Sequence, residues 1–271
     1  MNEQRAPCNI CLGSDFEPYL GPLPCGRSLT RCRDCGLVTA VPASGADPDA
    51  PVAAPNRARG DRTDLRRAAA VMRMLPGGKV LEIGCGTGSF LAALNPARYD
   101  VVGVEPSARS AAEARSRLAA CGTRATILEC RLTEAGLASD RFDLVAMFGT
   151  LGSCTSPRTT IMEASRLLRR GGYAVIETPS LSSLTARFCG TRWQPLSDPA
   201  AEYFFTAATL ERLAMMCGLI SGAAWLALPV GWPSPGTLVY VARKSGSPVR
   251  LAGLSELGPE VGKMAPMGAT H

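Results

Sequence analysis

The sequence predicts an α/β fold in which a doubly wound, mostly parallel sheet follows a small cysteine-rich module. Short apolar runs alternate with helical patterns from residue 63 to residue 217, as in sheets whose parallel strands are joined by crossover helices. One run leads into a glycine-rich turn, VLEIGCGTGSF, at residues 80–90. Ahead of these segments stand two Cys-x-x-Cys pairs. With 271 residues, the chain has room for one α/β domain and a small accessory module.

Apolar periodicity and turn residues divide the second part of the chain into elements. Pro76-Gly77-Gly78 ends the first helix, and the Ser107 hydroxyl can cap another. Two late strands, near 220–228 and 237–242, are close in sequence and are expected to pair antiparallel at one edge. The other expected strands are 79–83, 100–104, 125–129, 142–148 and 173–177, and the expected helices are 63–75, 89–94, 107–120, 156–168 and 207–217.

Composition predicts four regions along the chain. Residues 1–41 form the cysteine-rich module, and residues 42–61, rich in Pro, Ala, Gly and Asp, form a linker. Residues 62–243 form the α/β domain. Residues 244–271 contain repeated Gly, Pro and Ser with few large apolar groups, and predict a disordered tail.

The glycine-rich turn predicts a nucleotide-binding crevice. Gly84, Gly86 and Gly88 alternate along it, and Glu105 follows seventeen residues later at the end of the next apolar run. Glycines let the backbone approach a ligand closely, and an acid at the tip of the second strand can accept hydrogen bonds from ribose hydroxyls. The bland interpretation is that the glycines only shape a strand-to-helix turn; the acid and the later strands favour the site.

The two cysteine pairs predict a structural zinc site. Cys8 and Cys11 form one pair, Cys32 and Cys35 the other, with twenty residues between them. Two such pairs close a tetrahedral site with no open coordination position, so the metal would organise the segment rather than perform chemistry. A turn residue after each pair, Gly13 or Gly36, is expected to let backbone amides face the sulfurs. A redox pair or chance is the alternative.

Charge and hydropathy limit the classes of partner. The net charge is +6, but the basic residues are scattered, and the densest run, Arg57 to Arg67, is interpreted as a solvated helix face. This argues against nucleic acid as a partner. No apolar stretch approaches membrane-span length, and the N-terminus lacks the apolar core of a signal peptide, so a cytoplasmic location is expected. The sequence does not indicate an oligomeric state.

From Val80 to about Val241 the chain resembles the class I methyltransferases that use S-adenosylmethionine. With CNIC and CRDC at its start, it resembles the subgroup that carries an N-terminal four-cysteine module; FDLVAMF and LLRRGGYAVIETPS follow in the expected order. The resemblance implies a Rossmann-like fold and S-adenosyl-L-methionine as cofactor. It assigns Gly84, Gly86 and Gly88 to the cofactor loop. It also places Glu82 near the methionine end, Glu105 on the ribose and Leu132 against the adenine.

The chain departs from this subgroup where a catalytic base is expected. After the fourth strand, relatives commonly place an acid and then a Glu-His pair; here Gly149 and Gly152-Ser153 occupy those positions, and the only histidine is His271. Relatives commonly have a second histidine before aromatic residues in the late insertion, and Glu202 occupies that position here. Methyl transfer from a sulfonium mainly requires alignment, and a base is needed only when the acceptor must lose a proton.

Glu202 and Tyr203 are therefore the candidate catalytic residues. A carboxylate at 202 could act as base, and the Tyr203 hydroxyl could orient an acceptor oxygen. Trp193 and Phe204 could line a ring-binding wall or simply pack in the core. Cys154 is interpreted as an inert buried thiol.

Together these features predict an S-adenosylmethionine-dependent methyltransferase that works without a histidine base on a small organic acceptor, of the kind found in specialised metabolism. Two alternatives remain open. One is an RNA methyltransferase whose zinc module grips the nucleic acid, which predicts strong salt dependence. The other is a protein that binds the cofactor without methylating.

Overall fold

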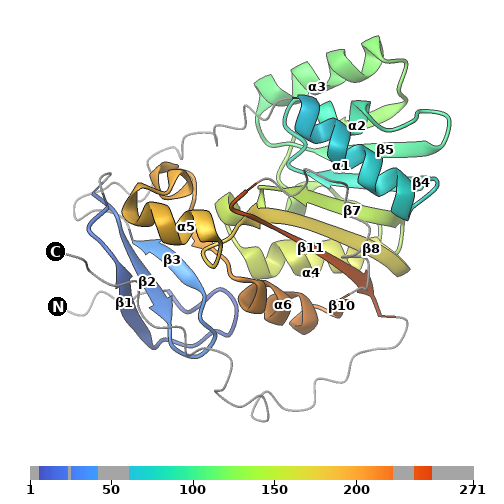
Figure 1. Ribbon diagram of the computed structural model, residues 1–271. Coiled ribbons are helices and arrows are strands. Elements are labelled where there is room, and N and C mark those ends of the chain that lie inside the picture. Colours follow the sequence, from blue (N-terminus) through green and yellow to red (C-terminus); the bar gives the residue numbers. More distant parts are fainter. Residues whose placement is uncertain (1–5, 24–25, 42–60, 222–234, 246–271) are drawn as a thin grey trace.

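The computed structural model describes residues 6–23, 26–41, 61–221 and 235–245 (Figure 1). Its larger sheet has seven strands in the order β10-β11-β8-β7-β4-β5-β6. Five of them run parallel, and β11 pairs antiparallel with both β8 and β10. The strands are β4 (Gly78–Ile83), β5 (Tyr99–Val104), β6 (Ala125–Leu128), β7 (Phe142–Phe148), β8 (Leu168–Pro179), β10 (Leu219–Ser221) and β11 (Thr237–Lys244).

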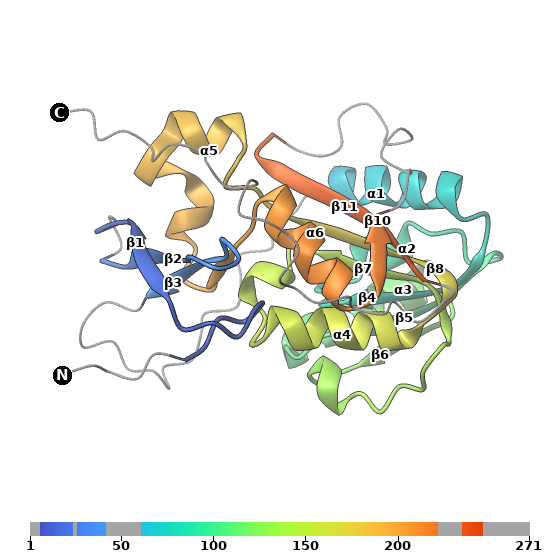
Figure 2. The same ribbon diagram turned by 90° about the horizontal axis from the view of Figure 1, so that it is seen from below.

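Helices cover both faces of this sheet. One hydrophobic cluster joins it to α1 (Asp61–Met74), α2 (Ser89–Ala92) and α3 (Ala108–Ala120). A second cluster joins the other face to α4 (Pro157–Leu167) and α6 (Ala207–Met216). Figure 2 shows α1 and α4 on opposite sides of the strands. The predicted doubly wound, mostly parallel fold is confirmed, including the antiparallel pairing at one edge.

The N-terminal segment forms a second sheet that is completed from far along the chain. β1 (Phe16–Leu20), β2 (Ser28–Cys32) and β3 (Val38–Val41) pair antiparallel in sequence order. The fourth strand is β9 (Tyr203–Phe204), which pairs antiparallel with β3 through Val38 and Thr39. The Ala40 N–H also donates to the Glu202 carbonyl at 2.8 Å. The larger α/β part of the chain therefore supplies one strand of the N-terminal sheet.

The insertion that carries β9 packs mainly on the N-terminal sheet. It contains α5 (Leu184–Cys189) and two short 3-10 helices, at Gly190–Arg192 and Gln194–Ser197. Trp193 and Phe204 are buried in one cluster with Leu29 and Val38. Core packing is thus the interpretation that the structure supports for these two aromatic residues.

Strand β8 is longer than the sequence predicts. It runs from Leu168 through the Arg169-Arg170-Gly171-Gly172 segment that was expected to be a turn. Its pairing with β7 is irregular there, because Leu168 lies opposite Phe142 while Tyr173 already lies opposite Leu144. Glycine suits position 172 because the strands approach closely there: a Cβ would come within 3.1 Å of the Asp143 carbonyl oxygen.

Two boundaries also differ from expectation. Lys244, assigned to the tail, ends β11, and its ammonium group donates to Asp140 and to the Leu168 carbonyl. Residue 61, assigned to the linker, begins α1. The rest of the predicted linker and tail, and most of the predicted strand 220–228, lie outside the described residues.

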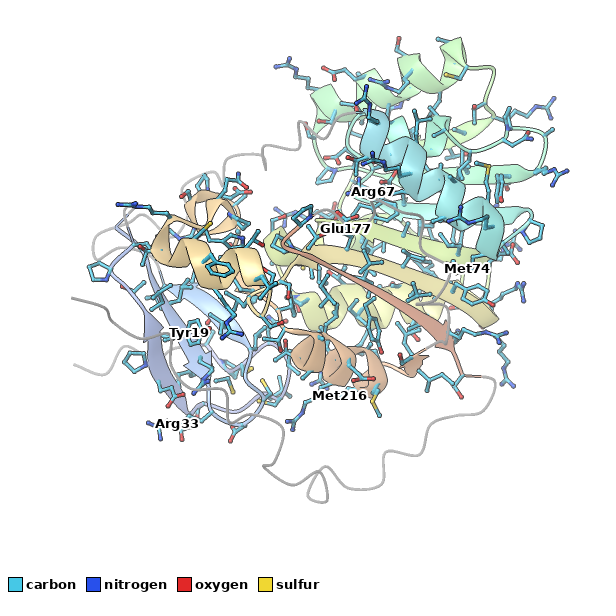
Figure 3. The ribbon with its side chains drawn as sticks, in the orientation of Figure 1. Tyr19, Arg33, Arg67, Met74, Glu177 and Met216 are labelled. Carbon is cyan, nitrogen blue, oxygen red and sulfur yellow. The ribbon has the colours of Figure 1, made fainter. Side chains whose placement is uncertain are left out.

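Arg67 is not on a solvated helix face, contrary to expectation. It lies on α1 with a side chain only 2% exposed, and it forms a bidentate pair with Glu177 of β8, at 2.9 Å from Nε and 2.6 Å from Nη2. Its remaining nitrogen donates to Asp64 at 2.5 Å, and the guanidinium stacks over Phe148, 4.5 Å from the ring centroid. Figure 3 shows Arg67 and Glu177 between α1 and the sheet. This ion pair fixes α1 against the carboxyl ends of β7 and β8.

Replacing Arg67 with Met is expected to reduce the free energy of unfolding by about 3–5 kcal/mol, because Glu177 would lose its partner in a buried site. Urea unfolding followed by circular dichroism measures the change. Arg66→Met, on the exposed side of the same helix, is the control and should shift it by less than about 0.5 kcal/mol. The double variant Arg67→Met/Glu177→Leu should recover most of the loss. A small effect of Arg67→Met would contradict this role.

Candidate functional site

The glycine-rich turn connects β4 to α2 at the carboxyl edge of the parallel strands. The Gly84 N–H donates to the Val104 carbonyl at 2.7 Å, which ties the start of the turn to the end of β5. The Gly88 N–H donates to the Cys85 carbonyl at 2.9 Å, and Gly88 caps α2. The turn therefore lies between two adjacent strand ends, where open α/β sheets bind their ligands.

The three glycines have separate roles. All three have φ between 54° and 73°, a region in which other residues are strained. A Cβ at Gly88 would meet Ala114 of α3 at 3.0 Å, so this glycine allows close helix packing. A Cβ at Gly86 would meet nothing within 4 Å. Gly86 is therefore required by its backbone conformation and not by a close neighbour.

Glu105 stands directly after β5 and is 7% exposed. One carboxylate oxygen accepts from the Gly86 N–H at 2.9 Å, and the other accepts from the Ser107 N–H at 3.0 Å. The side chain therefore holds the glycine turn and the start of α3 together. Each carboxylate oxygen can accept more than one hydrogen bond, so the same group can also receive hydroxyl groups of a ligand.

The other predicted cofactor residues lie around the same edge. Glu82 is buried in β4, next to last in the strand. Leu132 begins a 3-10 turn (Leu132–Glu134) after β6 and is partly buried against the core. Glu82, the glycines, Glu105 and Leu132 thus lie in or after the carboxyl ends of three neighbouring strands, β4, β5 and β6.

The loop after β7 contains the positions at which the expected acid and Glu-His pair are missing. Gly149 has φ 73°, and its N–H donates to the Glu177 carbonyl at 2.7 Å. Gly152 lies against β9: its carbonyl accepts from the Glu202 N–H at 2.8 Å, and a Cβ would come within 3.1 Å of the Tyr203 carbonyl oxygen. At Gly152 the loop thus approaches β9 so closely that a side chain would require a local shift of the backbone.

Glu202 and Tyr203 lie beside this loop. The Glu202 side chain is exposed, and partial burial raises the pKa of its carboxyl while Arg27 acts in the opposite direction. Burial raises the pKa of Tyr203 to about 12, so the phenol is neutral near pH 7. The Tyr203 hydroxyl donates to the Thr155 carbonyl at 3.2 Å. Burial also raises the pKa of Cys154 to about 11, which fits an inert thiol.

The four cysteines of the two pairs converge. Their sulfurs all lie within 4.8 Å of one another, with Cys8 and Cys35 at 3.4 Å and Cys11 and Cys32 at 3.5 Å. A tetrahedral zinc with bonds of about 2.3 Å would separate its sulfurs by about 3.8 Å. The set therefore fits a divalent metal with four thiolate ligands. A hydrogen bond from Cys35 lowers the pKa of Cys8 to about 5 and raises that of Cys35.

The two cysteine turns have the same backbone pattern. The Cys8 N–H donates to the Gly13 carbonyl, and the Cys32 N–H donates to the Leu37 carbonyl. Gly36, directly after the second pair, has φ 78°, but the equivalent residue after the first pair is Leu12, with φ 65°. Gly13 instead accommodates a close approach, since a Cβ would lie 2.0 Å from the Asp34 carboxylate. The sequence pattern does not indicate that Leu12 adopts the left-handed conformation.

Sequence reasoning also missed Asn9. Its side chain contacts Tyr203, Ser156 and the backbone of Arg158. No motif marks an asparagine between two metal ligands, and its partners come more than a hundred residues later.

Comparisons with known proteins agree with this geometry. The family described as "Methyltransferase domain" matches residues 58–219. A ubiquinone biosynthesis O-methyltransferase of Azorhizobium caulinodans is 26% identical over 146 residues, 52% of this chain and 58% of that protein. A malonyl-[acyl-carrier protein] O-methyltransferase of Enterobacter lignolyticus is 29% identical over 163 residues, 59% of this chain and 62% of that protein. The chain thus spans about three fifths of the length of these relatives.

Among solved structures, an S-adenosylmethionine-dependent methyltransferase of Thermotoga maritima, described as a possible histamine N-methyltransferase, has a TM-score of 0.52 and 26% identity. The match covers 68% of this chain and 91% of that one. None of the helices in the described ranges is long and apolar enough to cross a membrane. The family match covers more than half of the chain and includes the glycine turn and the strand ends around it. The chain therefore belongs to the methyltransferase-domain family.

Proposed function

We propose that this enzyme methylates an oxygen of a small organic acceptor and that this oxygen is acidic enough to need no histidine base. The observation that carries the proposal is the loop after β7, where Gly149 and Gly152-Ser153 stand in place of the usual acid and Glu-His pair and Gly152 packs closely against β9. The sequence holds one histidine, His271, outside the described residues. Glu202 and Tyr203 are then the side chains that act on the acceptor.

The acidity of the acceptor decides whether a base is needed. A carboxyl group with a pKa of about 4 is fully ionised at pH 7, whereas a phenol with a pKa of about 10 is ionised to about one part in a thousand. An unassisted phenol would therefore react about a thousandfold more slowly from this cause alone. A general base typically contributes about 10² to 10⁴. Glu202, with its raised pKa, is the candidate for that role with a weakly acidic acceptor.

The relatives support oxygen as the atom methylated. Both are named as O-methyltransferases, one of ubiquinone biosynthesis and one of malonyl-[acyl-carrier protein]. A malonyl group offers a carboxylate, which fits a site without histidine. These names point to such acceptors rather than to specialised metabolism.

For the cofactor, we assign Glu105 to the ribose hydroxyls, Leu132 to the adenine and Glu82 to the methionine end, with Gly84, Gly86 and Gly88 forming the turn over which the molecule lies. Bound S-adenosylmethionine supplies the activated methyl group. The chain's own residues orient it and exclude water. The buried carboxylate of Glu105 and the open space at Gly86 support this assignment.

For the cysteine cluster, we propose a structural Zn²⁺ held by Cys8, Cys11, Cys32 and Cys35. Four thiolates leave no open coordination position, so the ion would stabilise the N-terminal sheet and take no part in methyl transfer. Its support is the convergence of the four sulfurs within 4.8 Å.

Acceptor acidity can be tested by incubating the enzyme with labelled S-adenosylmethionine and three acceptors: a malonyl thioester, a catechol and a short RNA. We expect methylation of the malonyl carboxylate at a rate that does not change with pH above pH 6. With the catechol, the rate should rise with pH through the raised pKa of Glu202, and in Glu202→Gln the rise should move to the higher pH at which the catechol itself ionises. Labelling of RNA alone, with a steep decrease in added salt, would support the RNA alternative instead.

Replacing Glu105 with Ala is expected to weaken S-adenosylmethionine binding by about tenfold to a hundredfold, since hydrogen bonds to a charged group contribute about 1.5–3 kcal/mol. Calorimetry measures the dissociation constant. Glu113→Ala, which removes an exposed carboxylate of α3, is the control and should leave affinity unchanged. Equal affinities for the two variants would show that the ribose lies elsewhere.

Metal analysis of the purified protein is expected to give one zinc per chain. Cys32→Ser should lose the metal and lower the thermal midpoint, because structural zinc binding contributes directly to folding. Cys121→Ser, which changes an exposed cysteine outside the cluster, should keep the metal. Full zinc content in Cys32→Ser would rule out this site.

A further inference from the structure

Asn9 connects the cysteine cluster to the loop at the methyl-transfer face. It directly follows Cys8, and its side chain is half-buried between the N-terminal sheet and the larger domain. Its Oδ1 accepts from the Ser156 hydroxyl at 2.9 Å and from the Arg158 N–H at 3.2 Å, and its Nδ2 donates to the Tyr203 hydroxyl at 3.4 Å. One amide thus contacts the start of α4 and strand β9 together.

The donors and acceptors at this junction fix the orientation of the Asn9 amide, because the Arg158 N–H can only donate and so must face Oδ1. Tyr203 gives its own proton to the Thr155 carbonyl at 3.2 Å, so its oxygen accepts from Asn9. The Ser156 hydroxyl caps α4 by accepting from the Thr159 N–H at 3.2 Å, and its own proton lies between the Asn9 Oδ1 at 2.9 Å and the Thr159 hydroxyl at 3.0 Å. An amide meets both requirements because it carries an acceptor and a donor at its two ends.

These contacts fix one end of the loop after β7. Its other end is held by the Thr150 hydroxyl, which donates to the Ile83 carbonyl at 2.8 Å beside the glycine turn. In the middle, the Gly152 carbonyl accepts from the Glu202 N–H. The far end depends on Thr155 and Ser156, which contact Tyr203 and Asn9 respectively. The loop therefore bridges the cofactor turn and the cysteine cluster.

The cysteine turn in turn fixes Asn9. The Leu12 N–H donates to the Cys8 carbonyl at 2.9 Å, and the Ile10 N–H points to the Cys8 sulfur at 3.5 Å. Arg158 also donates to the Ile10 carbonyl at 2.6 Å. A metal held by Cys8 and Cys11 would thus immobilise the backbone on both sides of Asn9.

We propose that Asn9 is a positioning residue for methyl transfer, which holds Tyr203 and residues 150–156 in place for the acceptor and thereby couples the metal site to turnover. This inference rests on the proposed function, since it takes Tyr203 and the loop after β7 as the acceptor side of the site. It assigns the N-terminal sheet a role in catalysis that involves no chemistry at the metal.

The test compares Asn9→Ala with Arg33→Ala in the full-length, metal-loaded protein. Arg33 has the same position in the second cysteine turn, but its side chain is 58% exposed and pairs only with surface acids, Asp15 and Glu17 (Figure 3). The first measurement is hydrogen–deuterium exchange of amides 150–156 with S-adenosylmethionine bound. The second is turnover on whichever acceptor of the panel above is methylated.

We expect Asn9→Ala to keep its metal and its cofactor affinity while exchange in residues 150–156 increases and turnover falls by tenfold or more. Arg33→Ala should match the wild type in metal content, cofactor affinity, amide exchange and turnover. Asn9→Asp, which keeps an acceptor for Ser156 and Arg158, should recover part of the turnover. Asn9→Ala and Tyr203→Phe should be non-additive in a double-mutant cycle, because one acts through the other.

Unchanged exchange and turnover in Asn9→Ala would overturn the proposal. Loss of metal from this variant would also overturn it, since Asn9 would then support the cluster rather than the loop. If no acceptor is methylated by the wild type, the proposed function fails while the exchange measurement still decides whether Asn9 orders the loop.

Discussion

The short pairing of β9 with β3 determines how the parts of this enzyme are placed. It involves only Tyr203 and Phe204 against Val38 and Thr39, with one further bond from Ala40 to the Glu202 carbonyl. It brings the late insertion against the N-terminal sheet and places Glu202 and Tyr203 beside the loop after β7. It also sets the four cysteines next to α4 and α6, with which three of them share a hydrophobic core. Together with the contacts of Asn9 and the shared core, it fixes the cysteine turn relative to the loop after β7.

The parts of the fold that depend on local pattern could be predicted from the sequence. Alternating apolar runs predicted the parallel strands, and the glycine turn and Glu105 lie together at the carboxyl edge, as their positions in the sequence predict. The convergence of the four cysteines followed from their spacing. These features are visible because each depends on residues that lie within one or two elements of one another.

The features that were missed depend on contacts between distant segments. A two-residue strand such as β9 has no periodicity to detect, and Asn9 has no motif. The burial of Arg67 could not be inferred because its partner, Glu177, is 110 residues away. β8 also runs through Gly171 and Gly172, although its register with β7 is interrupted between Leu168 and Tyr173, and no local pattern indicates that the strand begins before these glycines.

The shared core has a consequence for how this protein can be divided. Cys8, Ile10, Cys32 and Leu37 are buried in the same cluster as Ile161 of α4 and Leu213 of α6. A fragment beginning after residue 41 would uncover the apolar side of both helices and leave β9 without its neighbour, so it would be prone to self-association. A designer who wishes to exchange the N-terminal piece for that of a relative would have to move β9 and the α4 cap with it. The two modules that the sequence predicts therefore share one hydrophobic core and one sheet.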